Sequence, residues 1–269
     1  MKIVCIGDCG VDHYMPSGKL LCGGITANFA LHAEAAFPVS DTITMISAWG
    51  KDEAAGIIRK RFEDSKIDCR IAALEGSSSV QYIEIEPDGE KKFIRYDEGV
   101  LRYFELSAED KRVIAASNLR VMPVFRQIHG FFDHVMAIGS AGLTAVDFAD
   151  FAEHPDFSLL DKYIDAIDIG FFGLSSEDDK LIDIIEEKAE VQNKLLVVTL
   201  GADGSIAFDG PESFSYGATP VDEVMDTTGA GDAFAAGFLS QYCYGQDVSA
   251  SLKSGASLAS VVIQRIGAN

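Results

Sequence analysis

Short apolar segments alternate with helical segments along most of this chain of 269 residues. The apolar segments predict buried strands, and they cover residues 1–6, 42–48, 119–123, 135–138, 144–147, 167–171 and 195–199. Apolar residues at helical spacing predict helices over residues 25–37, 54–62 and 177–192. Strands that alternate with helices usually pair in parallel and are covered on both faces. We therefore expect an α/β fold with a doubly wound, mostly parallel sheet.

One segment departs from this alternation and predicts a β-hairpin. Residues 80–86 alternate between apolar and polar side chains, residues 87–90 carry a turn signal, and residues 93–96 return as a second strand. We find no internal repeat, low-complexity tract or linker, and the length suits one large α/β domain. We expect residues 1–269 to form a single domain from which the hairpin projects.

The charge balance excludes two classes of partner. The chain has 42 acidic residues against 22 Lys and Arg, a formal net charge of −20. Nucleic acids and anionic membrane surfaces require a basic face, so we expect neither as a partner. No apolar stretch reaches the roughly 20 residues of a spanning helix. The first apolar run ends at Asp8, which is too early for a secretory leader.

The cysteines and histidines indicate no metal site. Five cysteines are scattered along the chain without a Cys-x-x-Cys pair, and the five histidines lack metal-ligand spacing. An odd number of scattered cysteines is typical of reduced thiols in the cytoplasm. We therefore expect a cytoplasmic protein without disulfides.

The most informative segment is Asp-Thr-Thr-Gly-Ala-Gly-Asp-Ala-Phe at residues 226–234. Apolar residues follow it at helical spacing, so the glycines stand at a helix start, where free N–H groups and the helix dipole bind anions. The amides of Gly229, Ala230 and Gly231 would form such an anion cradle. Asp232 would take a proton from an attacking hydroxyl while the cradle holds a phosphoryl group. Alternatively, Asp232 only complements the helix dipole.

Two other glycine motifs are excluded. The chain has no Gly-x-x-x-x-Gly-Lys-Ser/Thr segment, so it is not a P-loop protein. The pair Gly229-x-Gly231 is followed by Phe234 where a Rossmann motif has its third glycine, and it lies late in the sequence. A dinucleotide-binding dehydrogenase is therefore disfavoured.

Residues 226–234 closely resemble the signature of the ribokinase-like, or PfkB, family of carbohydrate kinases. Further segments resemble that family in the same order, at residues 7–12, 23–28, 198–204 and 259–268, the last as a helix beside the nucleotide base. The resemblance implies a ribokinase-like fold and ATP-dependent phosphorylation of a sugar hydroxyl with Mg²⁺. It also implies a small β lid over the sugar, formed by about residues 13–23 and 80–100.

The resemblance assigns roles to individual residues. Asp232 would be the base, with the Gly229–Gly231 amides as the cradle. The expected substrate-binding residues are Asp8, Asp12, Gly23, Gly24, Asn28 and Glu98. The expected nucleotide-binding residues are Thr199, Gly201, Asp203, Gly204 and Ser176. Ser176-x-x-Asp179 stands where the family has Asn-x-x-Glu, so Asp179 would reach Mg²⁺ through water. Some relatives also bind a monovalent cation near residues 221–226.

Within the family, the chain looks most like the fructoselysine (fructosamine) 6-kinases, on residues 97–100, 106–110 and 145–150. The negative charge would favour a cationic substrate, although solubility alone also accounts for it. The alternatives are another PfkB-type sugar or nucleoside kinase, or a ligand-binding protein on the same fold that does not turn over. An exposed lid edge would allow a homodimer through the lid.

Overall fold

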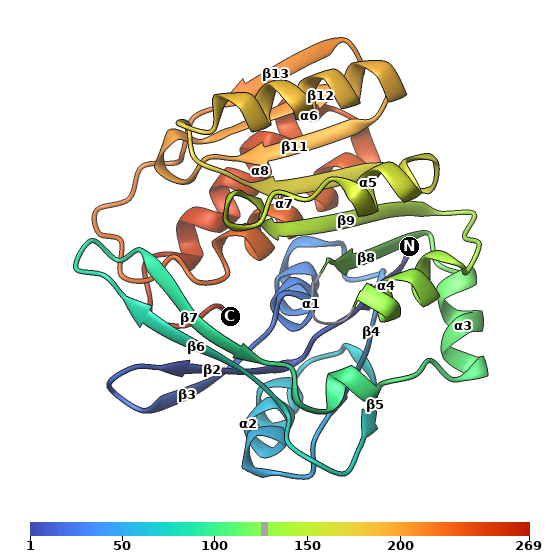
Figure 1. Cartoon of the computed structure of the whole chain (residues 1–269), viewed down its shortest axis with the longest axis vertical. Helices are drawn as coiled ribbons and strands as arrows, with labels where there is room; N and C mark the ends of the chain where they lie inside the picture. Colours follow the sequence, from blue (N-terminus) through green and yellow to red (C-terminus); the bar gives the residue numbers. More distant parts are fainter. Residues whose placement is uncertain (125–128) are drawn as a thin grey trace.

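The computed structural model describes residues 1–124 and 129–269 and contains two sheets (Figure 1). The large sheet has the order β13-β12-β11-β10-β9-β8-β1-β4-β5. Its strands are β1 (Lys2–Ile6), β4 (Thr42–Trp49), β5 (Asp68–Ala73), β8 (Leu119–Pro123), β9 (Leu143–Asp150), β10 (Ile169–Gly173), β11 (Leu195–Thr199), β12 (Ser205–Asp209) and β13 (Glu212–Tyr216). All pairs are parallel except those of β12 with β11 and with β13. The expected mostly parallel α/β fold is confirmed.

The second sheet lies beside the large one, at the lower left of Figure 1. Its strands are β2 (Gly10–Tyr14), β3 (Lys19–Gly23), β6 (Ser79–Ile85) and β7 (Lys91–Asp97), in the order β3-β2-β6-β7. The predicted hairpin is therefore present as β6 and β7, which pair antiparallel. The strand β2 pairs in parallel with β6, which joins the hairpin to the start of the chain.

Helices cover both faces of the large sheet. They are α1 (Ile25–Ala36), α2 (Glu53–Phe62), α3 (Ala108–Ala115), α4 (His129–Met136), α5 (Ser158–Tyr163), α6 (Asp179–Gln192), α7 (Ala230–Gly245) and α8 (Val248–Val262). Alternate residues of β1 point to opposite faces. Ile3 belongs to a core with residues of α1, α2, α7 and α8, whereas Val4 belongs to a second core with residues of α3, α4, α5 and α6. This arrangement is the expected double winding.

Side-chain caps fix where several helices begin. Asp52 accepts the Ala55 N–H at 3.0 Å at the start of α2, and it also accepts the Ser78 N–H and hydroxyl just before β6. Ser107 and Asp110 form a reciprocal capping box at the start of α3. These local bonds explain why the two helices begin where they do.

Two expectations about secondary structure are wrong. Residues 135–138 were expected to form a strand, but α4 runs through Met136. A short apolar run does not distinguish a strand from a helix, and here Phe132, Val135 and Met136 meet the core at helical spacing. The helix expected over residues 259–268 ends at Val262, and Gly267 has a φ of 106°, which helical residues do not adopt.

The strands deliver functional side chains to one edge of the large sheet. Asp8 follows β1, and Asp147 and Asp150 stand at the carboxyl end of β9. Ligands of open α/β sheets bind outside the carboxyl ends of the strands. The second sheet lies over this edge and encloses a cavity there.

Candidate active site

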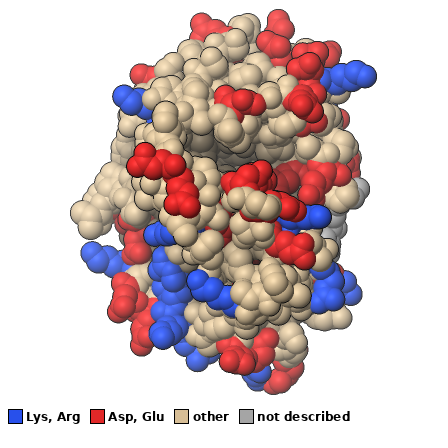
Figure 2. Space-filling model, turned by 90° about the vertical axis from the view of Figure 1, so that its left-hand side faces the viewer, with Lys and Arg blue, Asp and Glu red and all other residues tan. Residues whose placement is uncertain are grey.

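A cavity of about 440 Å³ lies between the two sheets. Its walls come from the ends of β1 and β9, the start of α1, the second sheet, the start of α7, Val124 after β8 and the segment 151–159 that follows β9. The expected site residues that line it are Asp8, Asp12, Gly24, Asn28, Gly229 and Asp232. Residues more than 200 positions apart in the sequence therefore meet in one space. The side of the molecule seen in Figure 2 is hollowed near its middle, and acidic side chains border the hollow.

The start of α7 has the geometry of an anion cradle. Gly229 is the N-cap residue in a left-handed conformation, with a φ of 78°. Among the described residues, the N–H groups of Gly231 and Asp232 have no backbone hydrogen-bond acceptor outside the helix. A Cβ atom at Gly231 would meet nothing within 4 Å beyond the backbone of its own helix. Free donors beside open space are what an approaching phosphoryl group requires.

Asp232 lies in the first turn of α7 and is 7% exposed. Its Oδ2 accepts a hydrogen bond of 2.8 Å from the Asn28 side-chain amide. Burial raises the pKa of Asp232 well above the usual carboxyl range, and the charges of Asp147, Asp8 and Asp12 add to the effect. A carboxylate with raised proton affinity is suited to accept a proton from an alcohol.

Asp8 accepts hydrogen bonds from backbone N–H groups at the start of α1. Its two carboxylate oxygens accept the N–H groups of Ile25 at 3.0 Å and Thr26 at 2.9 Å. Burial raises the pKa of Asp8 to about 6. A Cβ atom at Gly24 would lie 2.7 Å from the Asp8 carboxylate, and one at Gly23 would lie 2.3 Å from the Asp12 carboxylate. The glycine pair therefore allows both carboxylates to approach the helix start.

Asp12 is a buried carboxyl in the cavity, and one of its oxygens lacks a hydrogen-bond partner among the described residues. It stands on β2, is 2% exposed, and its Oδ2 has no hydrogen-bond partner among the described residues. Burial raises its pKa well above the usual range, and the charges of Asp8 and Asp226 act in the same direction. Buried polar atoms are rarely left without partners, so this carboxyl is poised for a polar ligand.

Asp226 ties the second sheet to the loop before α7. It is fully buried and accepts hydrogen bonds of 2.8 Å from the Tyr14 hydroxyl, the Thr228 N–H and the Gly267 N–H. Three donors from separate parts of the chain satisfy one carboxylate. Asp226 therefore links β2, the loop before α7 and the C-terminal segment through hydrogen bonds.

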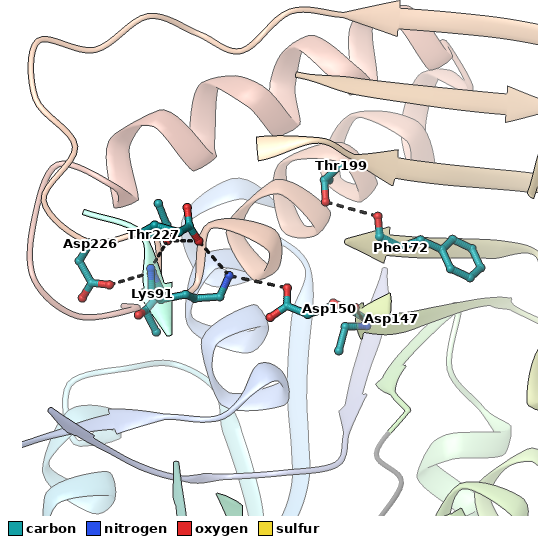
Figure 3. Close-up of polar contacts among 10 residues, drawn as sticks. Lys91, Asp147, Asp150, Phe172, Thr199, Asp226 and Thr227 are labelled. Atoms are coloured by element: carbon teal, nitrogen blue, oxygen red, sulfur yellow. Dashed lines mark hydrogen bonds and ion pairs between the residues drawn. The ribbon is translucent and has the colours of Figure 1, made fainter. Parts of the chain in front are cut away.

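Three charged residues were not singled out by the sequence: Lys91, Asp147 and Asp150, of which Asp150 lines the cavity (Figure 3). The Lys91 ammonium at the start of β7 lies 3.6 Å from Asp150 and 3.8 Å from Glu90. Burial would lower the pKa of Lys91, but these carboxylates outweigh it and raise the pKa, so the side chain stays charged. Burial also raises the pKa of Asp147 to about 6. Asp147 and Asp150 stand at a predicted strand end, and the rule that drew attention to Asp8 would have found them.

The tip of the second sheet docks against the loop that leads to α7. Lys91 donates its N–H to the Thr227 hydroxyl at 3.0 Å, and that hydroxyl donates to Glu90 at 2.9 Å. The Thr227 N–H in turn donates to the Gly89 carbonyl at 3.1 Å. The hairpin tip is thus fixed to the residues that position the cradle.

The expected nucleotide-binding residues do not line the cavity; four lie at the end of β11 or just after it, and Ser176 lies between β10 and α6. The Thr199 hydroxyl donates to the Phe172 carbonyl at 3.4 Å (Figure 3). Gly201 and Asp203 belong to the short helix η5 (Gly201–Asp203), and Gly204 follows with a φ of 97°. The Ser176 hydroxyl reaches over to Asp203 at 2.5 Å, so both belong to one cluster.

Five further expected residues do not line the cavity: Gly23, Glu98, Asp179, Ala230 and Gly231. Glu98 forms an ion pair with Arg102 of η1 (Gly99–Tyr103). Asp179 is exposed at the start of α6. In the part of the chain that the structure describes, no group of three or more His, Cys, Asp or Glu side chains is arranged to hold a metal ion.

Comparison with known proteins places this site in a family. A family model described as pfkB family carbohydrate kinase matches residues 170–269, which include the cradle. Fructoselysine 6-kinase of Escherichia coli is 30% identical over 266 residues, covering 98% of this chain and 97% of that protein. The chain belongs to the pfkB family of carbohydrate kinases. The fructosamine kinase FrlD of Bacillus subtilis is 25% identical to this pfkB-family kinase over 264 residues, covering 96% and 89% of the two chains.

Solved structures agree on the fold. Adenosine kinase from Sinorhizobium meliloti superimposes with a TM-score of 0.84 at 22% identity, covering 100% of this chain and 95% of that one. Ribokinase from Arabidopsis thaliana, complexed with ribose and ATP, gives a TM-score of 0.79 at 19% identity, covering 99% and 93%. The ribokinase-like fold is therefore confirmed. Among the described helices, none is both long and apolar enough to cross a membrane.

Proposed function

We propose that this carbohydrate kinase transfers the γ-phosphoryl group of ATP to a primary hydroxyl of a fructosamine, with the 6-hydroxyl of fructoselysine as the preferred acceptor. The observation that carries the reaction type is the buried carboxylate of Asp232, in the first turn of α7 and inside a cavity with other buried carboxyls. The choice of acceptor is supported by the fructoselysine and fructosamine kinases among its relatives.

The proposed chemistry uses Asp232 as the general base. Its carboxylate accepts the proton of the substrate hydroxyl as the hydroxyl oxygen forms a bond to the γ-phosphorus. The bond between that phosphorus and the bridging oxygen breaks, and ADP leaves with the electron pair. Asn28 donates a hydrogen bond to Asp232 Oδ2, which orients the carboxylate and leaves its other oxygen for the substrate.

The transferred group would rest against the start of α7. The free N–H groups of Gly231 and Asp232, with that of Gly229, would stabilise the charge that develops on the phosphoryl oxygens. The Ala230 N–H, expected in the cradle, instead donates to the Thr227 carbonyl at 3.2 Å. The space at Gly231 allows this approach, because a Cβ there would face open space beyond the backbone of its own helix. Asp8, Asp12, Gly23, Gly24, Asn28 and Glu98 are the proposed sugar-binding residues.

The proposed contacts to the remainder of ATP are Thr199 at the end of β11, the following residues Gly201, Asp203 and Gly204, and Ser176, whose hydroxyl donates to Asp203. Mg²⁺ binds proteins through one or two carboxylates together with substrate phosphates and water. Asp179 would reach it through water, and when bound the ion would neutralise phosphate charge. A monovalent cation near residues 221–226, a cytoplasmic location and a homodimer through the second sheet stay predictions.

The second sheet would act as a lid that excludes water, which otherwise competes with the sugar as acceptor. The hydrogen bond from the Lys91 N–H to the Thr227 hydroxyl at the tip of this sheet supports a lid role. Tyr14 on β2 reinforces this contact through Asp226.

A panel of acceptors tests the proposal. ADP release with Mg-ATP would be measured for fructoselysine, psicoselysine, fructose, ribose, adenosine and a blank without sugar. We expect fructoselysine to give a kcat/KM at least about tenfold above every other acceptor, which corresponds to roughly 1.4 kcal/mol of preferential transition-state binding. Turnover with ribose or adenosine alone would contradict the proposed substrate class.

A further inference from the structure

Residues 267–269 pack against the two helices that carry Asn28 and Asp232. The Ala268 carbonyl accepts a hydrogen bond of 2.8 Å from the ring of His32 on α1. A Cβ atom at Gly229, the residue before α7, would lie 2.6 Å from Ala268. The segment is therefore held between the start of α7 and the middle of α1.

The side-chain amide of Asn269 joins three elements of the fold. Its Nδ2 donates to Asn28 Oδ1 at 2.6 Å and to the Cys22 carbonyl at 3.0 Å. Its Oδ1 accepts a hydrogen bond of 2.8 Å from Arg61 Nε. Asn28 lies on α1, Cys22 on β3 and Arg61 on α2, so this one amide connects a helix of the large layer to the second sheet.

Asn28 continues this series of hydrogen bonds to the proposed base. It is 4% exposed, and its Oδ1 is occupied by Asn269. Its Nδ2 donates to Asp232 Oδ2 at 2.8 Å. The series therefore runs from the exposed guanidinium of Arg61 through two amides to Asp232.

The groups at the outer end of the series fix the direction in which both amides point. A guanidinium can only donate hydrogen bonds, and a backbone carbonyl can only accept them. Arg61 therefore requires the oxygen of Asn269, and the Cys22 carbonyl requires its NH₂ group. Asn28 must then present its oxygen to Asn269 and its NH₂ group to Asp232. In the reverse orientation the Asn28 oxygen would face a carboxylate oxygen, which is favourable only if Asp232 is protonated.

We propose that Asn269 is a positioning residue for phosphoryl transfer, which acts through Asn28 to keep Asp232 ready to accept the substrate proton. The inference rests on the proposed function, because it requires Asp232 to be the general base. It adds to that function a residue that is not among those lining the cavity. The contribution of Asn269 is the orientation of the Asn28 amide.

The charges around Asp232 make this orientation consequential. Burial raises its pKa most, and carboxylates on three other elements add to the effect: Asp147 on β9, Asp8 after β1 and Asp12 on β2. The Asn28 hydrogen bond lowers the pKa. Lys91 on β7 is a cation whose own pKa is raised in part by the Asp232 charge. Weaker donation from Asn28 would therefore leave more of the base protonated at a given pH.

A double-mutant cycle tests whether Asn269 acts through Asn28. We expect Asn269→Ala to lower kcat about tenfold and to leave the KM for ATP unchanged, because a hydrogen bond to a charged group is weakened. In an Asn28→Ala background the same change should lower kcat less than about twofold, since the connecting amide is absent. Gln264→Ala is the matched control. It removes a nearby amide that donates to the Ser260 carbonyl at 2.7 Å, and it should leave kcat unchanged.

The pH profile provides a measurement that a simple loss of packing would not alter. The acid limb of kcat in Asn269→Ala should lie about one pH unit above that of wild type, because the pKa of Asp232 rises. Asn269→Asp keeps the side-chain shape and the acceptor for Arg61, but it cannot donate to Asn28. Its acid limb should lie at least as high as that of Asn269→Ala, and that of Gln264→Ala should not move.

The outcomes separate this inference from the proposed function. A tenfold loss with Asn269→Ala in both backgrounds, an unmoved acid limb, or an equal loss with Gln264→Ala would show that Asn269 only stabilises the fold. The positioning role would then be wrong, while a large loss of turnover in Asp232→Asn would keep the proposed base. Near-normal turnover of folded Asp232→Asn would remove both the base and the positioning role. Thermal unfolding of each variant establishes that folded proteins are compared.

Discussion

The two walls of the cavity are built in different ways. The wall at α7 comes from consecutive residues, in which Gly229 sets the backbone turn, Gly231 leaves space and Asp232 follows within one helical turn. The opposite wall comes from β2, β6 and β7, whose residues meet only through sheet pairing. The proposed reacting groups are therefore specified locally, whereas the proposed substrate-selecting wall depends on long-range assembly. The following changes test that division, beginning with the largest expected effect.

Replacing the base should have the largest effect. We expect Asp232→Asn to lower kcat between about 100-fold and 10,000-fold, the usual range for loss of a general base. The amide can still accept the hydrogen bond from Asn28, so ATP binding by calorimetry and the melting temperature should be preserved. Near-normal turnover in a folded variant would exclude Asp232 as the base.

The two cradle glycines should respond differently to a methyl group. At Gly231 a Cβ meets nothing within 4 Å beyond the backbone of its own helix, so Gly231→Ala should keep its melting temperature and lose about 100-fold in kcat/KM as the methyl fills the phosphoryl position. At Gly229 a Cβ would lie 2.6 Å from Ala268 and φ is 78°, so Gly229→Ala should also lose about 1–3 kcal/mol of stability. Full activity in Gly231→Ala would show that the phosphoryl group lies elsewhere.

The acid limb of the pH profile should reflect the burial of Asp232. Only the deprotonated carboxylate can accept a proton, so kcat/KM should fall about tenfold per pH unit below its pKa. Because burial raises that pKa, the limb should lie well above pH ~3.9, the value of an ordinary aspartate. A limb near pH 4 in a pH–rate measurement would contradict the raised pKa.

The same shift has a consequence for stability. A carboxyl with a raised folded pKa binds its proton more tightly in the folded state than in the unfolded state. Its contribution to stability is present below the unfolded pKa and is lost as the pH rises through the folded pKa. Asp232→Asn should therefore be at least as stable as wild type at neutral pH, which thermal unfolding can measure.

The difference between local and long-range assembly also explains which elements could be predicted from the sequence. The strands at residues 119–123 and 195–199 have the predicted bounds, because short apolar runs between turn signals are read from local composition. The start of α7 was predicted correctly from the glycines at residues 229 and 231. By contrast, the strands β5, β12 and β13 were not predicted. The side chains of β5 and β13 are only partly buried, and β12 offers only three apolar residues between Ser205 and Asp209.

The contacts that join the two walls were the least predictable. The pairing of Tyr14 with Asp226 spans 212 positions, and no local pattern links the two residues. From the sequence alone, Lys91 is expected to be a solvent-exposed hairpin residue. In the structure its ammonium group lies 3.6 Å from the Asp150 carboxylate. Such contacts depend on how the second sheet lies over the first, which is a property of the assembled chain.

The smallest effect should come from loosening the contact between the walls. Thr227→Val keeps the side-chain shape but removes the hydroxyl that accepts the Lys91 N–H and donates to Glu90. We expect kcat/KM to fall about fivefold, since a single exchanged hydrogen bond contributes about 1 kcal/mol, and the Lys91 amide to exchange faster with solvent. Ser17→Ala is the matched control, because its hydroxyl bonds within the turn between β2 and β3 and makes no contact with α7. If both variants change activity equally, general stability of the second sheet accounts for the loss. If only Thr227→Val does so, docking of the hairpin tip on the cradle loop couples the selective wall to the reactive one.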